Sequence, residues 1–484
     1  MNLFMNVKRL FTIILSIFIL MNSTFSVFAS EEVLERLDAH RAIIPESDSI
    51  PNWPTAPAIG AESACMIDVN TGTIIYNKKM DEQHFPASTT KIMTCLLAAE
   101  NCSMDEIVTF SKEAVFTTER GSSNVGMDVG QSITMEEALY CILLASANEV
   151  ASAVAEHVAG SIDDFAIMMN ERAKELGCEN THFANANGLP NDDHYTTAHD
   201  LALIGCEFFK NDQLCKIAGT TYYEIHATAT QPDEFGMTNH HKMLLPSSDL
   251  YYEYTVGGKT GYTNVARQTL VTCAEKDGKK FVCTVMNDES PYQFKDTTSL
   301  FEYGFDNFTM LNIADNETKY NIDNSNFFDT NTTIFGQTKN IFTLDKEGYV
   351  ILPSTASFED LSSELDYSDA EESILAKIRY TYQDIPVGST DIILNLAKNE
   401  VFEFGRTPTV PEKENLEDIK KDQNKVIFLD IRPYLLGAAI IIVFLFFFFI
   451  IKAILKNYNF SKRRQRRLRK KARHYRSDFD DFDF

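Results

Sequence analysis

Apolar residues alternate with polar ones in several short stretches, and this period of two predicts β-strands. The first stretch, ESACMIDVNTGTIIYNKK, predicts two strands that turn at Asn70-Thr71-Gly72. Three further strands are predicted near Tyr254–Tyr262, Thr269–Ala274 and Lys280–Met286, and the last two are joined by Asp277-Gly278.

Between these strands the apolar positions follow helical spacing, from Thr89 to about Leu176, and Gly177 is a plausible helix stop. Strands at both ends of a helical block predict an α+β domain, a sheet covered by helices. After Phe308 the alternation returns in short runs, at Ile341–Leu344, Tyr349–Leu352, Ile374–Tyr382 and Asp391–Leu396. About a hundred residues of this kind predict a small all-β domain over residues 309–405.

The N-terminus has the order of a secretory signal peptide. Lys8 and Arg9 precede an apolar run, and Val27-Phe28-Ala29 provides small residues for a cut after Ala29. An uncleaved membrane helix is the alternative, because the apolar stretch that ends at Ala29 nearly spans a bilayer. Both interpretations place the following residues outside the cytoplasm. Residues 30–58 are predicted to form a loosely structured lead-in that ends in PNWPTAP.

Near the C-terminus, residues 434–451 read YLLGAAIIIVFLFFFFII without a charge, which predicts a transmembrane helix. The basic block KRRQRRLRKK follows, and such residues concentrate on the cytoplasmic side of a membrane helix. The block could also bind nucleic acid or anionic lipid, but the retention of basic residues on the cytoplasmic side of the membrane explains it without either. We therefore expect a single-pass cell-membrane protein with an extracytoplasmic body, a charged stalk at 406–433 and a cytoplasmic tail at 452–484.

Charge divides the chain in the same way. Residues 452–484 carry 12 Lys/Arg against 4 Asp/Glu, and residues 1–29 carry two basic side chains. Because the whole chain has a net charge of −25, the residues between these ends sum to −35. So acidic an exported part excludes general electrostatic binding of nucleic acid.

The nine cysteines predict buried thiols rather than a disulfide framework. Their number is odd, and most of them occur within apolar periodic segments, where cysteine behaves as a small buried hydrophobe. The sequence contains no C-x-x-C or H-x-x-x-H pattern that would indicate a metal site, and no metal or cofactor is expected. The cysteines are Cys65, Cys95, Cys102, Cys141, Cys178, Cys206, Cys215, Cys273 and Cys283.

Three short motifs carry candidate chemistry. In Ser88-Thr89-Thr90-Lys91, a hydroxyl and an amine three residues apart lie on one helix face, and a neighbouring base can activate a serine. Ser146-Ala147-Asn148 brings a hydroxyl and a carboxamide toward a cleft. Lys259-Thr260-Gly261, followed by Tyr262, suits carboxylate recognition on a strand that substrate approaches closely. Taken singly, each also fits a helix cap or a glycine-rich turn.

In this order, the three motifs resemble the set found in penicillin-binding proteins and class A β-lactamases. The chain is similar to the low-molecular-mass penicillin-binding proteins, the serine-type D-alanyl-D-alanine carboxypeptidase family. The similarity covers roughly residues 56–308 and includes FPASTTKIMT, NTHFANANGLPNDDHYTTAHDLALI and GGKTGYT. It implies a penicillin-binding/β-lactamase-like transpeptidase fold for residues 59–308.

The resemblance also implies roles for single residues. Ser88 would be acylated and Lys91 would activate it, while Ser146 would relay a proton to the leaving D-alanine and Asn148 would orient the substrate amide. Lys259 and Thr260 would hold the terminal carboxylate, and the backbone amides of Ser88 and Tyr262 would form the oxyanion hole. The implied substrates are peptidoglycan stem peptides, and β-lactams would be covalent inhibitors.

The chain departs from the family pattern in two places. Ala147 stands where glycine is frequent, and Asn239-His240-His241 has a histidine where a second asparagine is expected. We expect both histidines at the rim of the pocket rather than as metal ligands.

Other functions remain possible from the sequence. A β-lactamase is disfavoured because no E-x-x-L-N follows Ser146-Ala147-Asn148. A catalytically silent wall-binding or β-lactam-sensing module is disfavoured by six intact motif side chains. A transpeptidase stays open, because an amine can replace water as the acceptor.

Overall fold

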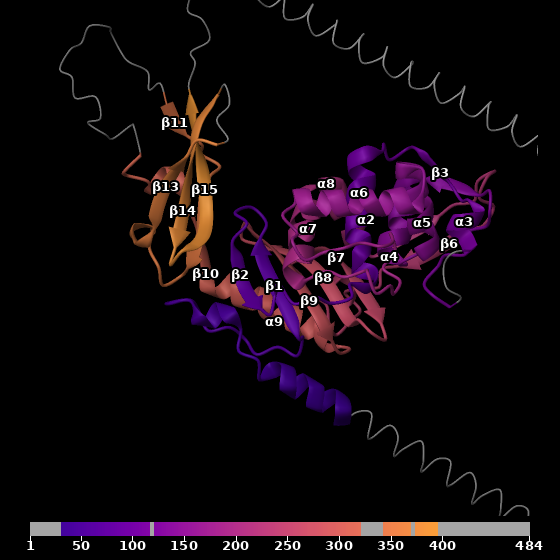
Figure 1. Cartoon of the computed structure of the whole chain (residues 1–484), viewed down its shortest axis with the longest axis horizontal. Helices are drawn as coiled ribbons and strands as arrows, with labels where there is room; N and C mark the ends of the chain where they lie inside the picture. Colours follow the sequence, from indigo (N-terminus) through magenta and orange to yellow (C-terminus); the bar gives the residue numbers. More distant parts are fainter. Residues whose placement is uncertain (1–30, 117–120, 321–341, 369–372, 395–484) are drawn as a thin grey trace, which may run out of the picture. The chain divides into compact units, whose positions relative to one another are not determined.

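The computed structural model describes residues 31–116, 121–320, 342–368 and 373–394 (Figure 1). The predicted signal peptide, stalk, transmembrane helix and tail lie outside these ranges. Within the described ranges, no helix combines the length and the apolar character needed to cross a membrane.

A five-stranded antiparallel sheet forms the centre of the fold, in the order β2-β1-β9-β8-β7. The predicted N-terminal hairpin is confirmed, as is the predicted trio of later strands. Gly72 and Gly278 both have positive φ in the turns that join neighbouring strands, where glycine is unstrained. The strands are β1 (Ser63–Asp68), β2 (Ile74–Lys78), β7 (Thr255–Thr263), β8 (Arg267–Lys276) and β9 (Lys279–Asp288).

Alternation along the strands directs side chains to two apolar layers. In β1, Cys65 and Ile67 join one buried cluster, whereas Ala64 and Met66 join the other. The first layer is shared with the helices that carry the functional site, and α9 packs on the opposite face of the sheet (Figure 1). The α+β architecture predicted from the sequence is therefore confirmed.

The predicted helical block, from Thr89 to about Leu176, divides into several helices and contains one short strand pair, and a second short pair follows it. Gly177, with φ +85°, follows α6 as predicted. The helices are α2 (Lys91–Asn101), α3 (Lys112–Phe116), α4 (Met135–Leu144), α5 (Asn148–Ala159), α6 (Ile162–Glu175), α7 (Ala198–Lys210), α8 (Asp212–Gly219), α9 (Tyr292–Asn307) and α10 (Ile313–Asn316). The short strands are β3 (Ile107–Thr109), β4 (Ser132–Thr134), β5 (Tyr222–Ile225) and β6 (Phe235–Thr238).

A second antiparallel sheet follows α9, in the order β10-β12-β15-β14-β13, with β11 paired to β15. Three of the predicted strands correspond to β11, β12 and β14, and the fourth, predicted at Asp391–Leu396, overlaps β15, which begins earlier, at Ile385. Residues 341, 395 and 396 of these predictions lie outside the described ranges. The structure adds β10 and β13. Both sheets belong to one compact unit, so the boundary of a separate all-β domain stays a prediction. The strands are β10 (Phe308–Asn312), β11 (Phe342–Leu344), β12 (Tyr349–Pro353), β13 (Ser362–Asp366), β14 (Ile374–Tyr382) and β15 (Ile385–Leu394).

The prediction of a loosely structured lead-in is wrong for much of that segment. Residues 31–41 are helical, and Leu37 is fully buried. Arg36 forms a 2.7 Å ion pair with Glu289, far along the chain. Trp53 is also buried, and its indole nitrogen donates a hydrogen bond to the carbonyl of Ile75. These contacts are long-range, and a local hydrophobic pattern does not reveal them.

Candidate active site

Ser88 lies in a tight turn, the 3-10 helix η2 (Ala87–Thr90), which leads directly into α2. Ala87 is buried and has φ +49°, an unusual conformation for alanine. The Pro86 carbonyl accepts hydrogen bonds from the hydroxyls of Thr89 and Thr269, at 2.6 and 2.9 Å. The turn that presents Ser88 is thus fixed to the neighbouring strand β8.

Lys91 is fully buried in the first turn of α2, with its amine beside Ser88. Its Nζ lies 3.1 Å from Ser88 Oγ, 2.7 Å from Asn148 Oδ1 and 2.5 Å from the Asn187 carbonyl oxygen. Burial lowers the pKa of Lys91 well below its ordinary value, and the nearby Lys259 lowers it further. The amine is positioned, and its pKa shifted, as a base for Ser88 requires.

The predicted second motif occupies the bend between α4 and α5. Ser146 has φ +61° and is nearly buried, and its Oγ has no hydrogen-bond partner among the described residues. A buried hydroxyl without a partner is costly, and a bound ligand can satisfy it. Ala147 has φ −61° and ψ 116°, so this position does not require glycine. Asn148 begins α5 and accepts its hydrogen bond from Lys91.

The third motif lies on β7, which is an edge strand of the central sheet. Lys259 is buried, and its Nζ donates a 2.9 Å hydrogen bond to the Thr260 carbonyl. Burial lowers the pKa of Lys259 to about 8. Tyr262 is half exposed at the end of the motif. Among the described residues no strand pairs with the outer edge of β7, so an extended peptide can pair there beside Ser88.

All eight residues expected from the sequence converge on one cleft. Ser88, Ser146, Thr260, Gly261 and Tyr262 line a pocket, and Ser88 and Tyr262 also line a second pocket that contains Asn148. The two lysines, Lys91 and Lys259, lie buried behind these walls. Among the described residues, no Asp or Glu lines either pocket.

Three further residues support the cleft and were not assigned roles from the sequence. Ser123 lines both pockets, and its backbone carbonyl accepts a 2.9 Å hydrogen bond from the backbone N–H of Asn148. Asn187 contributes its carbonyl to Lys91, and Gly188 packs against the Ala87 carbonyl, where a Cβ would lie only 1.8 Å away. NANGLP, which contains Asn187 and Gly188, belongs to a segment that resembles the family, but no spacing rule predicted the contacts of these residues.

The two adjacent histidines have different environments. His240 lines the Ser88 pocket, as expected. His241 is buried, so its prediction as a rim residue is wrong. Its Nε2 lies 2.8 Å from Thr272 Oγ1, and burial lowers its pKa to about 3, which keeps the ring neutral. The ring occupies the space that a side chain at Gly258 would need, since a Cβ there would lie 2.5 Å from Nε2.

We expect Gly261→Ala to lower the rate of the Ser88 acylation that the family resemblance implies by at least about 100-fold, because a displacement of about 1 Å near reacting groups costs this much. A Cβ at Gly261 would lie 2.2 Å from Thr269 Oγ1 and 3.0 Å from the Ser88 nitrogen, so it would displace the hydroxyl that anchors the Pro86 carbonyl and press on the Ser88 turn. Labelling with fluorescent penicillin measures the rate. Gly72→Asn is the control, because its Cβ meets open space at φ +73°. Equal rates in Gly261→Ala and wild type would contradict the tight packing.

Comparison with known proteins gives a consistent result. Residues 51–290 match the model of a family described as D-alanyl-D-alanine carboxypeptidase. The chain is 34% identical over 250 residues to D-alanyl-D-alanine carboxypeptidase DacF of Bacillus subtilis. The aligned region covers 51% of this chain and 62% of that relative. It is 30% identical over 263 residues to the D-alanyl-D-alanine carboxypeptidase of Streptomyces sp. strain K15, with 52% and 89% covered. The chain thus spans less than two thirds of the Bacillus relative and most of the Streptomyces one.

Proposed function

Because the chain belongs to the D-alanyl-D-alanine carboxypeptidase family, we propose that it removes the terminal D-alanine from peptidoglycan stem pentapeptides. The observation that carries this proposal is the buried Lys91 amine, 3.1 Å from Ser88 Oγ, in a cleft that also contains the other two motifs. No cofactor or metal takes part in the proposed reaction.

Acylation begins when the neutral Lys91 amine takes the proton of Ser88, whose Oγ attacks the carbonyl carbon of the penultimate D-alanine. The backbone amides of Ser88 and Tyr262 stabilise the oxyanion that forms. The bond to the terminal D-alanine then breaks, and Ser146 relays a proton to the leaving amine. Water subsequently hydrolyses the ester on Ser88 and releases the shortened peptide.

Substrate recognition uses the same cleft. The buried Lys259 and the hydroxyl of Thr260 hold the terminal carboxylate, which only a C-terminal residue provides. Asn148 orients the substrate amide through the carboxamide that Lys91 fixes. A β-lactam carries a carboxylate and a reactive acyl group in a similar relation, so we also propose covalent inhibition by penicillin.

The products of a D-alanine-terminated pentapeptide test this proposal. Mass spectrometry should detect a tetrapeptide that has lost one alanine, and the corresponding peptide ending in L-alanine should remain intact. Crosslinked products would instead identify a transpeptidase. An unchanged pentapeptide together with stable penicillin labelling would identify a β-lactam-sensing module.

We expect a bell-shaped pH dependence of kcat/KM for D-alanine release. Activity should rise from low pH as Lys91 loses its proton, and fall as pH increases through about 8, because Lys259 then loses the proton that it needs to hold a carboxylate. Initial rates across pH 5–10 measure the profile. Lys259→Arg should remove the alkaline limb, since arginine stays protonated. An unchanged alkaline limb in that variant would show that a group other than Lys259 causes the loss of activity at high pH.

We also propose that this reaction occurs on the outer side of the cell membrane. The support is the apolar run at 434–451, the basic block after it and the signal-peptide pattern at 1–29. The segment between α9 and the membrane would then hold the cleft away from the lipid, within reach of the wall. Membrane anchoring and the small all-β domain are both parts of this proposal.

Protease added to wall-stripped cells should release a soluble penicillin-binding fragment and leave an epitope beyond Lys471 protected. A chain truncated before Tyr434 should appear in the medium and remain active. Cleavage of the tail epitope from outside, or membrane retention of the processed truncated chain, would contradict this topology.

A further inference from the structure

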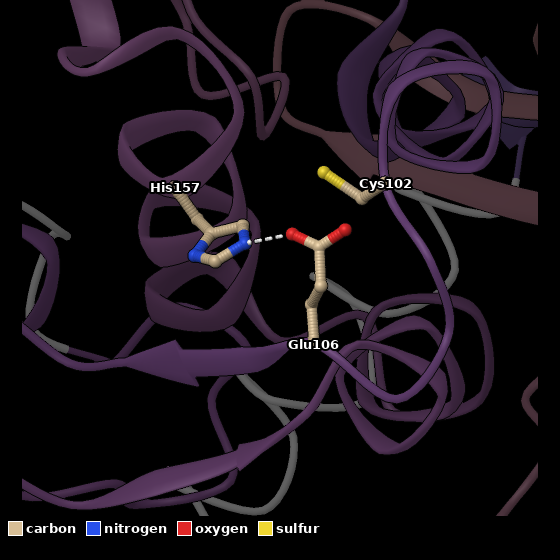
Figure 2. Close-up of side chains that lie close together, drawn as sticks. All are labelled: Cys102, Glu106 and His157. Carbon is tan, nitrogen blue, oxygen red and sulfur yellow. Dashed lines mark hydrogen bonds and ion pairs between the residues drawn. The ribbon is translucent and has the colours of Figure 1, made fainter.

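We propose a divalent transition-metal site, best suited to zinc, formed by Cys102, Glu106 and His157 (Figure 2). The site lies outside the cleft and is independent of the proposed reaction. Cys102 is the C-cap that follows α2, Glu106 precedes β3 and His157 lies in the last turn of α5.

The three donor atoms already face one another. One donor atom from each residue lies within 4.8 Å of the other two, and His157 Nε2 is 2.9 Å from Glu106 Oε2. The Glu106 carboxylate lies between the imidazole and the thiol (Figure 2). Zinc bonds of about 2.0–2.3 Å place tetrahedral ligands roughly 3.3–3.8 Å apart, so small side-chain rotations suffice to bind the metal.

The donor types match the preferences of zinc. A thiolate, an imidazole and a carboxylate are its usual protein ligands, and a water molecule can complete a tetrahedron on the exposed side. The other carboxylate oxygen of Glu106 accepts a 2.6 Å hydrogen bond from the Ser103 amide. Such a bond fixes the orientation of a ligating carboxylate.

The cysteine is also distinguished from the others in the chain. Seven of the nine thiols are buried, and only Cys102 and Cys215 are partly exposed. The thiol of Cys215 donates to the Phe209 carbonyl and lies near Lys280, whose positive charge disfavours a cation there. Cys102 instead lies beside a carboxylate and an imidazole.

The electrostatic setting favours a cation. Cys102 caps the C-terminus of α2, and His157 lies in the last turn of α5. The C-terminal end of a helix carries a partial negative charge from its unpaired carbonyl groups. Two such ends meet at this cluster, and the thiolate and the carboxylate add two formal charges that a divalent ion balances.

Two other groups of potential ligands are weaker candidates. Glu62 and Glu82 lie near His84, but Lys79 already forms ion pairs with both carboxylates. The second group, on the β5–β6 hairpin, is exposed and contains no sulfur ligand; it consists of Glu224, His226 and Glu234. The Cys102 cluster is therefore the strongest candidate among the described residues.

The position of the cluster suggests what a bound metal does. α2 begins at Lys91 and α5 begins at Asn148, and these side chains are hydrogen-bonded at 2.7 Å. The opposite ends of the same helices meet at Cys102 and His157, about 16 and 14 Å along the two axes. The two helices are therefore parallel and packed together, and the metal would clamp them at the end remote from the cleft.

Zinc binding to the full chain tests the proposal. Competition with a chromophoric chelator should give one zinc ion per chain, and Co²⁺ should produce a thiolate-to-cobalt charge-transfer band. Cys102→Ser and His157→Gln should each weaken binding by more than the roughly 10–100-fold that a change in an outer-shell partner costs. Zinc should also raise the thermal midpoint of the wild type but not of these variants. Cys215→Ser and His226→Gln are the matched controls and should bind as the wild type does.

Absence of stoichiometric zinc binding to the wild type, or of the thiolate band, would overturn the site. Equal affinity in Cys102→Ser and wild type would also overturn it. Penicillin labelling of each variant confirms that the cleft is folded, because none of these residues lines it. If either of these results overturned the site, Glu106 and His157 would form only a surface ion pair beside the thiol of Cys102.

Discussion

Ser88→Ala is expected to lower kcat for D-alanine release by on the order of 10⁶-fold, the loss typical when a serine nucleophile is removed. Alanine cannot form the ester that the proposed reaction requires. The fold should remain intact, because Ser88 Oγ contacts the Lys91 amine, which keeps hydrogen bonds to Asn148 and to the Asn187 carbonyl. Release of D-alanine by purified protein measures the loss.

The control for this variant is Ser299→Ala, on the exposed side of α9, where the hydroxyl only donates to the Lys295 carbonyl. Its rate should equal that of the wild type. A Ser88→Ala protein that retains more than about a hundredth of the activity would place the nucleophile elsewhere.

Lys91→Arg should lower the acylation rate by roughly 10²–10⁴-fold, the usual contribution of a general base. Arginine retains hydrogen-bond donors for the partners of Lys91, but it stays protonated and cannot accept the proton of Ser88. Stopped-flow labelling with a chromogenic β-lactam measures acylation separately from the release of product.

Lys91→Ala should lose acylation to a similar extent, but it also destabilises the fold. It leaves the buried oxygens of Asn148 and Asn187 without their donor, which costs about 1–3 kcal/mol for each unpaired group. The arginine variant therefore separates the loss of the base from the loss of the fold. Acylation at a near wild-type rate in Lys91→Arg would show that another group activates Ser88.

Local sequence signals predicted much of this molecule. Alternation and turn residues identified the hairpin around Gly72 and the β8–β9 turn at Gly278, because the neighbours of a strand in an antiparallel sheet are often close in sequence. The three motifs identified eight cleft residues, since each motif lies within a single turn or strand. The meeting of the three motifs in one cleft depends on the sheet, and only the family resemblance predicted that meeting.

Long-range contacts limited the remaining predictions. Residues 31–41 form a helix that buries Leu37 and pairs Arg36 with the distant Glu289, and local periodicity does not reveal such contacts. His241 is buried because the ring fits beneath Gly258 of β7. The Cys102 and His157 donors are 55 residues apart in the sequence, so no spacing pattern relates them. Such features depend on tertiary packing and were visible only in the structure.

The most direct test of the account is the identity of the residue that a β-lactam acylates in the wild-type chain. Protein quenched during reaction with penicillin should gain the mass of one drug molecule, and peptide mapping should place the adduct on Ser88, within the segment FPASTTK. One adduct per chain is expected, and it should be absent from Ser88→Ala. An adduct on any other residue, or no adduct in protein that releases D-alanine, would contradict it.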